Sequence, residues 1–128
     1  MLFRSLIFGI NDINTSKPVY VVEGPIDSLF LDNCIAVASS SLGKIKQLKQ
    51  NDVDYVMVFD NQPRNKELCS LINKAINNNY KVVIWPQSIS EKDINEMVLA
   101  GRNVKKIIFD NTFSGLEASA KFVGWKRI

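Results

Sequence analysis

The chain has 128 residues, a length that suits one domain, and 46% of them are hydrophobic, which is enough to bury a single core. Its net charge of +3 is mildly basic, so it permits a nucleic-acid partner without arguing for one. Histidine is absent and the two cysteines, Cys34 and Cys69, lie far apart, which excludes a zinc site of the Cys/His type within this chain. Both cysteines are expected to be reduced thiols in the core.

The N-terminal stretch 1–18 is expected to be a lead-in to a single-domain core at 19–128. Its short apolar run is followed by polar "NDINTSKP", where a signal peptide would need small residues and a cleavage site. No segment approaches the roughly 18 apolar residues of a membrane span. We therefore expect a cytoplasmic protein with no membrane partner.

Four short runs rich in Val and Ile predict buried strands, because they do not alternate with polar residues. They lie at 19–23, 34–39, 54–60 and 81–85. A weaker fifth run at 105–110 is also expected to form a strand.

Helical patterns lie between these runs. Gly24 and Pro25 indicate a turn into a helix, with proline at the first helical position. After Asn65, apolar residues recur at helical spacing until the asparagines at 77–79, which predict its end. A shorter helix is marked by three apolar residues, Leu42, Ile45 and Leu48.

The last third of the chain predicts two more helices. One has Ser90 as its expected cap and Gly101 as its terminating residue. The other is expected to pack through Leu116 and Phe122. Alternating strands and helices predict an α/β fold with a mostly parallel sheet of about four to five strands and helices on both faces.

Acidic residues follow the predicted strands, at the sheet edge where such folds bind ligands. Glu23 ends the first run, Asp60 ends the third, and the loop after the fourth leads to Asp93. If these three runs are neighbours, the carboxylates meet at one edge. Because like charges repel unless a cation lies among them, oxygen ligands of this kind suit Mg²⁺.

Each of these charged residues also has a purely structural interpretation. Glu23 and Asp60 can be the polar ends of strands, while Asp27 can stabilise the N-terminus of its own helix. Asp93 can cap a helix or complete a capping box with Ser90. For the neighbouring cations the alternative is a solvated surface charge, as for Arg64 and Lys92.

Three ordered stretches resemble the motifs of the TOPRIM domain, which topoisomerases and primases share. They are "VVEGPIDSLF", "VFDNQPRNKE" and "KDINEMV". The resemblance is strongest to the C-terminal part of T-even-type bacteriophage DNA primases, and it extends from "FGIND" to the closing "GLEASAKFVGWKRI". It implies a TOPRIM-like, Rossmann-like fold.

The resemblance also implies roles for individual residues. Glu23, Asp60 and Asp93 would be catalytic, and together with Gln62 they would hold Mg²⁺, with Mn²⁺ as the alternative ion. Nucleotide or nucleic-acid phosphates would be bound by Arg64 and Lys92. Four further residues match the motifs with less defined roles: Gly24, Asp27, Asn61 and Asn95.

The function implied is that of the catalytic portion of a DNA primase. Such a portion makes RNA primers on a single-stranded DNA template by magnesium-dependent transfer of nucleotides from nucleoside triphosphates. Expected partners are a replicative helicase and a separate primase N-terminal or zinc-binding part, since those subdomains are expected to be absent from this chain. If the chain is viral, the compartment is the host-cell cytoplasm.

One departure from the TOPRIM pattern is Gln62, which stands where the second acid of an Asp-x-Asp pair is usual. An amide oxygen can still bind a metal ion, but one negative charge is lost. Gln62 is the main support for one alternative, a non-catalytic module that binds DNA or a helicase. A small metal-dependent TOPRIM nuclease also stays open, because the TOPRIM scaffold supports phosphodiester cleavage with the same acids.

Overall fold

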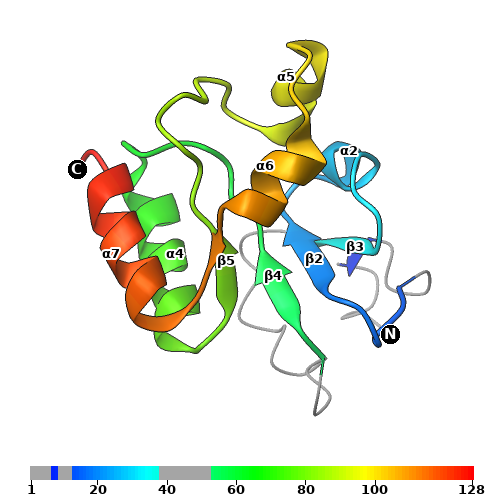
Figure 1. The fold of residues 1–128 in the computed structure, drawn as a ribbon, viewed down its shortest axis with the longest axis horizontal. Helices are drawn as coiled ribbons and strands as arrows, with labels where there is room; N and C mark the ends of the chain where they lie inside the picture. The colour runs from blue at the N-terminus through cyan, green and yellow to red at the C-terminus, as the bar shows by residue number, and fades with distance from the viewer. Residues whose placement is uncertain (1–6, 9–12, 38–52) are drawn as a thin grey trace.

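The computed structural model describes residues 7–8, 13–37 and 53–128 (Figure 1). Within these ranges there is a six-stranded sheet in the order β1-β3-β2-β4-β5-β6. Its four central strands are parallel: β2 (Val19–Val22), β3 (Cys34–Val37), β4 (Tyr55–Met57) and β5 (Lys81–Val83). Two-residue antiparallel strands lie at the edges: β1 (Ile7–Phe8) and β6 (Thr112–Phe113). The predicted mostly parallel α/β sheet is confirmed, with six strands instead of four to five.

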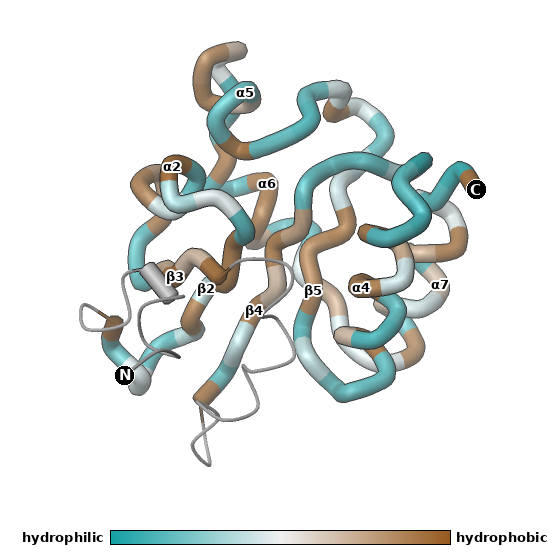
Figure 2. The backbone as a smooth tube through the Cα atoms, turned by 180° about the vertical axis from the view of Figure 1, so that it is seen from behind, coloured by the Kyte–Doolittle hydropathy of each residue, from teal (hydrophilic) through white to brown (hydrophobic). Residues whose placement is uncertain are grey.

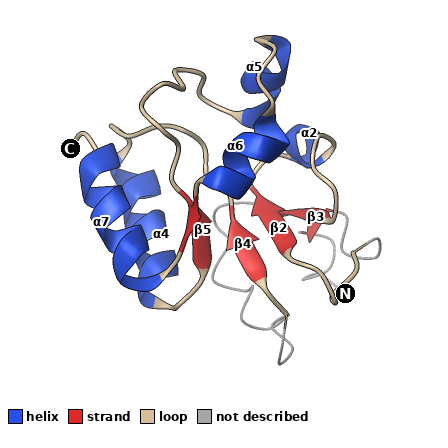
Figure 3. Cartoon of the chain, in the orientation of Figure 1, coloured by secondary structure: helices blue, strands red, loops and turns tan. Residues whose placement is uncertain are grey.

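Helices cover both faces of this sheet (Figure 3). The longer pair, α4 (Lys66–Asn77) and α7 (Gly115–Trp125), lies side by side on one face. The shorter pair, α5 (Ile94–Leu99) and α6 (Val104–Asp110), packs on the other. A single-turn helix, α2 (Pro25–Ser28), follows β2 and begins with proline at its first position, as predicted.

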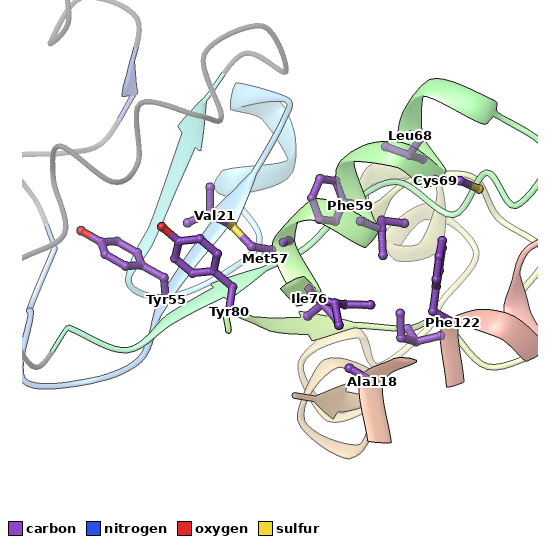
Figure 4. Packing of buried hydrophobic residues seen from close by; sticks show 14 of the residues in the cluster. Val21, Tyr55, Met57, Phe59, Leu68, Cys69, Ile76, Tyr80, Ala118 and Phe122 are labelled. Atoms are coloured by element: carbon purple, nitrogen blue, oxygen red, sulfur yellow. The ribbon is translucent and has the colours of Figure 1, made fainter. Parts of the chain in front are cut away.

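Each central strand supplies side chains to both hydrophobic clusters, because successive residues of a strand point to opposite faces. On β4, Met57 packs toward α4 and α7, whereas Val56 packs toward α5 and α6. On β5, Val82 and Val83 divide in the same way. Burial on both faces explains why apolar residues follow one another in these strands without alternating with polar ones. Figure 4 shows the α4 and α7 side of this core.

Helix α4 has clear signals at both ends. The Asn65 side chain caps its start by accepting a hydrogen bond from the Leu68 amide at 3.0 Å. The helix ends at Asn77, within the predicted stop, and Asn79 has a positive φ of 66°. Hydrophobic and hydrophilic residues alternate along it in Figure 2 as expected for an amphipathic helix.

The prediction of a fifth strand at 105–110 is wrong, because this segment is helix α6. The Asn103 side chain caps it by accepting from the Lys106 amide at 3.3 Å. Val104 and Ile108, one turn apart, are its buried residues. A run of apolar residues alone does not distinguish a short helix from a strand.

Two details of the other helices also differ from expectation. The N-cap of α5 is Asp93, not Ser90, which lies three residues earlier and is exposed. Helix α7 packs through Phe122 as predicted, but Leu116 is 88% exposed and points away from the core. Gly101 follows α5 with a positive φ of 81°, in agreement with its predicted terminating role.

Both cysteines are free thiols, as predicted, although Cys34 is only half-buried. Burial, followed by the nearby charge of Asp27, raises the pKa of Cys34 to about 12. None of the helices in the described ranges is long and apolar enough to cross a membrane. The helix predicted from Leu42, Ile45 and Leu48 lies outside the described residues.

Candidate functional site

The three motifs meet at the carboxyl edge of the parallel sheet. Strands β2 and β4 pair directly, with Val21 opposite Met57, so the segments that leave them are neighbours. Glu23 directly follows β2, and Asp60 lies three residues beyond β4. β5 is the next strand in the sheet, which confirms that the first, third and fourth predicted runs are neighbours.

Asp60 lies close enough to the other acids for their charges to change its pKa. Burial raises its pKa to about 6, and the charges of Asp27, Glu23 and Asp93 act in the same direction. Lys92 opposes this shift, so its ammonium also lies within electrostatic reach. The structure therefore brings together four acids and one lysine from the three motifs.

Asp27 has a larger role than its motif position indicated. Its side chain is only 8% exposed, and Oδ1 accepts a hydrogen bond from the Asn95 amide of α5 at 3.0 Å. Asp27 thus binds the N-terminus of α5, not that of its own helix α2. Burial raises the pKa of Asp27, the Asn95 hydrogen bond lowers it, and the charges of Asp93 and Glu23 raise it further.

Gly24 gives the Asp27 carboxylate the room that it needs. A Cβ atom at position 24 would lie 3.2 Å from Asp27 Oδ2, closer than nearly all such contacts. To admit a side chain there, the Asp27 carboxylate, whose other oxygen binds the Asn95 amide, would have to shift by a few tenths of an ångström. The glycine of the first motif therefore has a steric explanation in this structure.

Asp93 caps α5, as one structural interpretation of the sequence allowed, and it also belongs to the acidic cluster. Its Oδ1 accepts from the Glu96 amide at 2.8 Å and caps α5. In return, Glu96 Oε2 accepts from the Lys92 amide at 3.3 Å, as in a capping box shifted by one residue. The carboxylates of Asp27 and Asp93 both lie at the positive end of the same short helix.

Asn61 holds the loop after β4 in place. Its main-chain amide donates to Lys92 O at 2.6 Å. Its side-chain amide donates to the carbonyls of Ile89 at 2.9 Å and Glu91 at 3.1 Å, and its Oδ1 accepts from Trp125 Nε1 at 3.0 Å. The sequence showed Asn61 only as part of a motif, because its partners lie 28 to 64 residues away.

The remaining predicted residues lie around this cluster. Gln62 is half-buried in the turn after Asp60, where its main-chain amide donates to Asp60 O at 3.0 Å. Its side chain makes no hydrogen bond to the residues that the structure describes. Arg64 is exposed beyond this turn, and Asn95 contributes its main-chain amide to Asp27.

The four acids do not form a ready-made metal cage. In the described ranges, no group of three or more His, Cys, Asp or Glu side chains is placed to hold one metal ion. Asp27 and Asp93 already accept hydrogen bonds from α5. Mg²⁺, however, commonly keeps several water ligands and binds one or two carboxylates directly, so an incomplete cage still suits this ion.

The comparisons with known proteins point to one relative. No family model matches the chain. The sequence is 29% identical, over 128 aligned residues, to the DNA primase of Enterobacteria phage T4. The match covers 95% of this chain and 36% of that primase, so the chain spans about a third of its relative's length. The chain is therefore related to part of a phage DNA primase.

Proposed function

We propose that this chain is the TOPRIM catalytic portion of a DNA primase, which makes RNA primers on single-stranded DNA from nucleoside triphosphates. The observation that carries the proposal is the meeting of four acids at the carboxyl edge of the sheet, where burial and the three other carboxylates raise the pKa of Asp60 to about 6. Acids placed so that they repel one another are a hallmark of functional sites. The similarity to part of a phage DNA primase supports the choice of reaction.

Asp60 and Glu23 are the proposed direct ligands of Mg²⁺ or Mn²⁺, because their carboxylates are not engaged by α5. The amide oxygen of Gln62 and the carboxylate of Asp93 complete the proposed set. Bound there, the ion would lower the pKa of the attacking 3′-hydroxyl and neutralise charge on the pyrophosphate leaving group. A hard cation among these acids also relieves the repulsion that raises the pKa of Asp60.

The other residues of the site position these groups and the substrate. Asn61 fixes the loop that carries Asp60 against the segment that carries Lys92. Lys92 is proposed to bind triphosphate as a point charge, and Arg64 to bind a phosphate through two parallel N–H donors. A replicative helicase and a separate primase N-terminal or zinc-binding part are proposed partners in the complete reaction.

Thermal unfolding with increasing Mg²⁺ tests the metal site. At tenfold excess over the dissociation constant, we expect about 1.4 kcal/mol of stabilisation, or roughly 5 °C in Tm. The double variant Asp60→Asn, Asp93→Asn should lose this response while remaining no less stable without the ion, since asparagine also caps helices and repulsion is relieved. The matched control, Asp32→Asn with Asp110→Asn, removes the same charge from exposed ion pairs elsewhere.

A response to Mg²⁺ that is equal in the wild type and the Asp60, Asp93 double variant would contradict the proposed metal site. The reaction itself is tested with labelled single-stranded DNA, Mg²⁺ and nucleoside triphosphates. Primer synthesis that the double variant lacks is the expected result. Degradation of the DNA without triphosphates would indicate the nuclease alternative instead.

A non-catalytic module is the second candidate, and two observations favour it. Gln62 is neutral, and no three acids in the described ranges are placed to hold one ion. Gln62→Glu separates the candidates, because a fourth charge near Asp60 should strengthen Mg²⁺ binding if the site still binds metal. An unchanged response to Mg²⁺ would favour the module.

A further inference from the structure

A groove beside the acidic cluster is lined by basic side chains instead of acidic ones. It has a volume of about 580 Å³ and lies between the segment that leaves β5, strand β6 and helix α7. We name it the α7 groove, and its lining residues include Asn61, Trp85, Ser90, Phe113, Lys121 and Arg127. None of the acids that the structure describes lines it, although the acidic cluster begins one residue away, at Asp60.

No acid of the described ranges neutralises the cations of the α7 groove. The ion pairs of the described ranges involve Lys81, Arg102, Lys105 and Lys106. Lys121 instead lies over the Phe113 ring, with Nζ 5.2 Å from the centroid. Arg64, which follows the lining residue Pro63 in the chain, also makes no ion pair within the described ranges.

Intramolecular hydrogen bonds fix the Arg127 side chain but engage only one of its guanidinium nitrogens within the described ranges. Its Nη1 donates to the carbonyls of Gly124 at 2.7 Å, Lys126 at 3.0 Å and Trp125 at 3.2 Å. The other guanidinium nitrogens make no hydrogen bond to the described residues, which leaves donors for a ligand. Its main-chain amide donates to Pro63 O at 2.7 Å, next to Arg64.

The two cations of the α7 groove stand at different places in the chain. Lys121 lies within α7, whereas Arg127 lies two residues beyond the end of the helix at Trp125. Cations at separate places can contact successive phosphates of a chain. Asn61 and Ser90 also line the groove, so a strand lying in it would reach the acidic edge of the sheet.

We propose that the α7 groove binds the phosphate backbone of single-stranded nucleic acid. Both tryptophans that line it are at most 9% exposed, so they offer no free ring for stacking, and binding should depend little on sequence. The proposal shares a partner with the proposed function but uses none of its acids. It can therefore be tested without divalent ions.

Fluorescence anisotropy with a labelled 20-nucleotide oligothymidylate, in EDTA at low salt, measures this binding. Reversing two charges in Lys121→Glu, Arg127→Glu should weaken it by roughly tenfold or more and make the slope of log K against log salt shallower by about 1.4, or 0.7 per contact. The matched control, Lys105→Glu with Lys106→Glu, makes the same charge change on α6 and should retain most of the affinity.

Lys121→Glu alone guards against a folding defect, because Lys121 makes no hydrogen bond or ion pair with the described residues. It should unfold like the wild type and bind more weakly, with about half the change in slope. Several results would overturn the proposal: no binding by the wild type, equal losses in the groove and control variants, or full displacement by equimolar nucleoside triphosphate. Failure of primer synthesis with binding intact would leave it standing and count only against the proposed reaction.

Discussion

Helices α4 and α5 begin in different ways, although both follow a strand of the same sheet. Helix α4 has twelve residues and is capped by a neutral side chain from the preceding position, Asn65. Helix α5 has six residues, and its first amides bind two carboxylates, one of them from Asp27, 68 residues earlier in the chain.

The difference shows that the two sides of one sheet are stabilised in different ways. On the α4 side, local capping and a large apolar cluster stabilise a scaffold without placing charges close together. On the α5 side, a short helix is fixed by acids that repel one another. That repulsion opposes folding, and it is explained if these acids serve a ligand.

The largest effect should come from breaking the scaffold. Ile72 is 2% exposed in the cluster under α4, so Ile72→Ala should lower the free energy of unfolding by about 3–4 kcal/mol. Urea unfolding measures this. Mg²⁺ should still raise the Tm of the folded fraction, because the acidic edge is untouched. Loss of the Mg²⁺ response would mean that the two sides are not separable.

A smaller effect should come from Asp27, which joins α2 to α5. Asp27→Ala leaves the Asn95 amide without its partner and should destabilise the protein by about 1–2 kcal/mol. Asp27→Asn keeps an acceptor and removes a charge, so it should be at least as stable as the wild type at pH 7. Urea unfolding of the pair separates hydrogen bonding from repulsion; equal destabilisation by both would show that the charge itself is favourable.

The acidic edge should also make stability depend on pH. Because the pKa of folded Asp60 is about 6, above the ordinary 3.8, the folded state keeps a proton that the unfolded state has lost. Stability should therefore fall as the pH rises from 4 to 6.5, by on the order of 1 kcal/mol after allowance for solvent screening. Asp60→Asn should flatten this part of the curve. A wild-type curve that rises over the same range would contradict the raised pKa of Asp60.

The smallest effect is expected at the neutral cap. Asn65→Ala should cost about 1 kcal/mol by leaving the Leu68 amide without its partner. The loss should be the same at pH 4.5 and pH 7, since no charge is involved. A loss that changed over this pH range would show that the α4 cap is coupled to the acids.

Much of the fold could be predicted because the parallel strands are buried on both faces. Their uninterrupted Val and Ile runs predicted all four central strands and the edge where Glu23 and Asp60 lie. Helix α6 was missed because its apolar run has no period long enough to recognise, and the decisive signal is the cap at Asn103. The exposure of Leu116 was missed because apolar character does not fix which side of a helix packs.

The site could be predicted only as far as local spacing reaches. Acids at strand ends predicted that Glu23 and Asp60 would be close, but not that Asp27 would bind a helix 68 residues away. The four hydrogen bonds of Asn61 were likewise invisible, because they depend on how the sheet brings distant segments together.

The two tryptophans of the chain give this protein a built-in optical reporter. Trp85 Nε1 donates to Phe59 O at 2.8 Å, and Trp125 Nε1 donates to Asn61 Oδ1 at 3.0 Å, so the two indoles are bonded on either side of Asp60. Tryptophan fluorescence excited at the red edge of the absorption band should therefore respond to any displacement of this loop. Labels or engineered probes are unnecessary for following what happens at the acid.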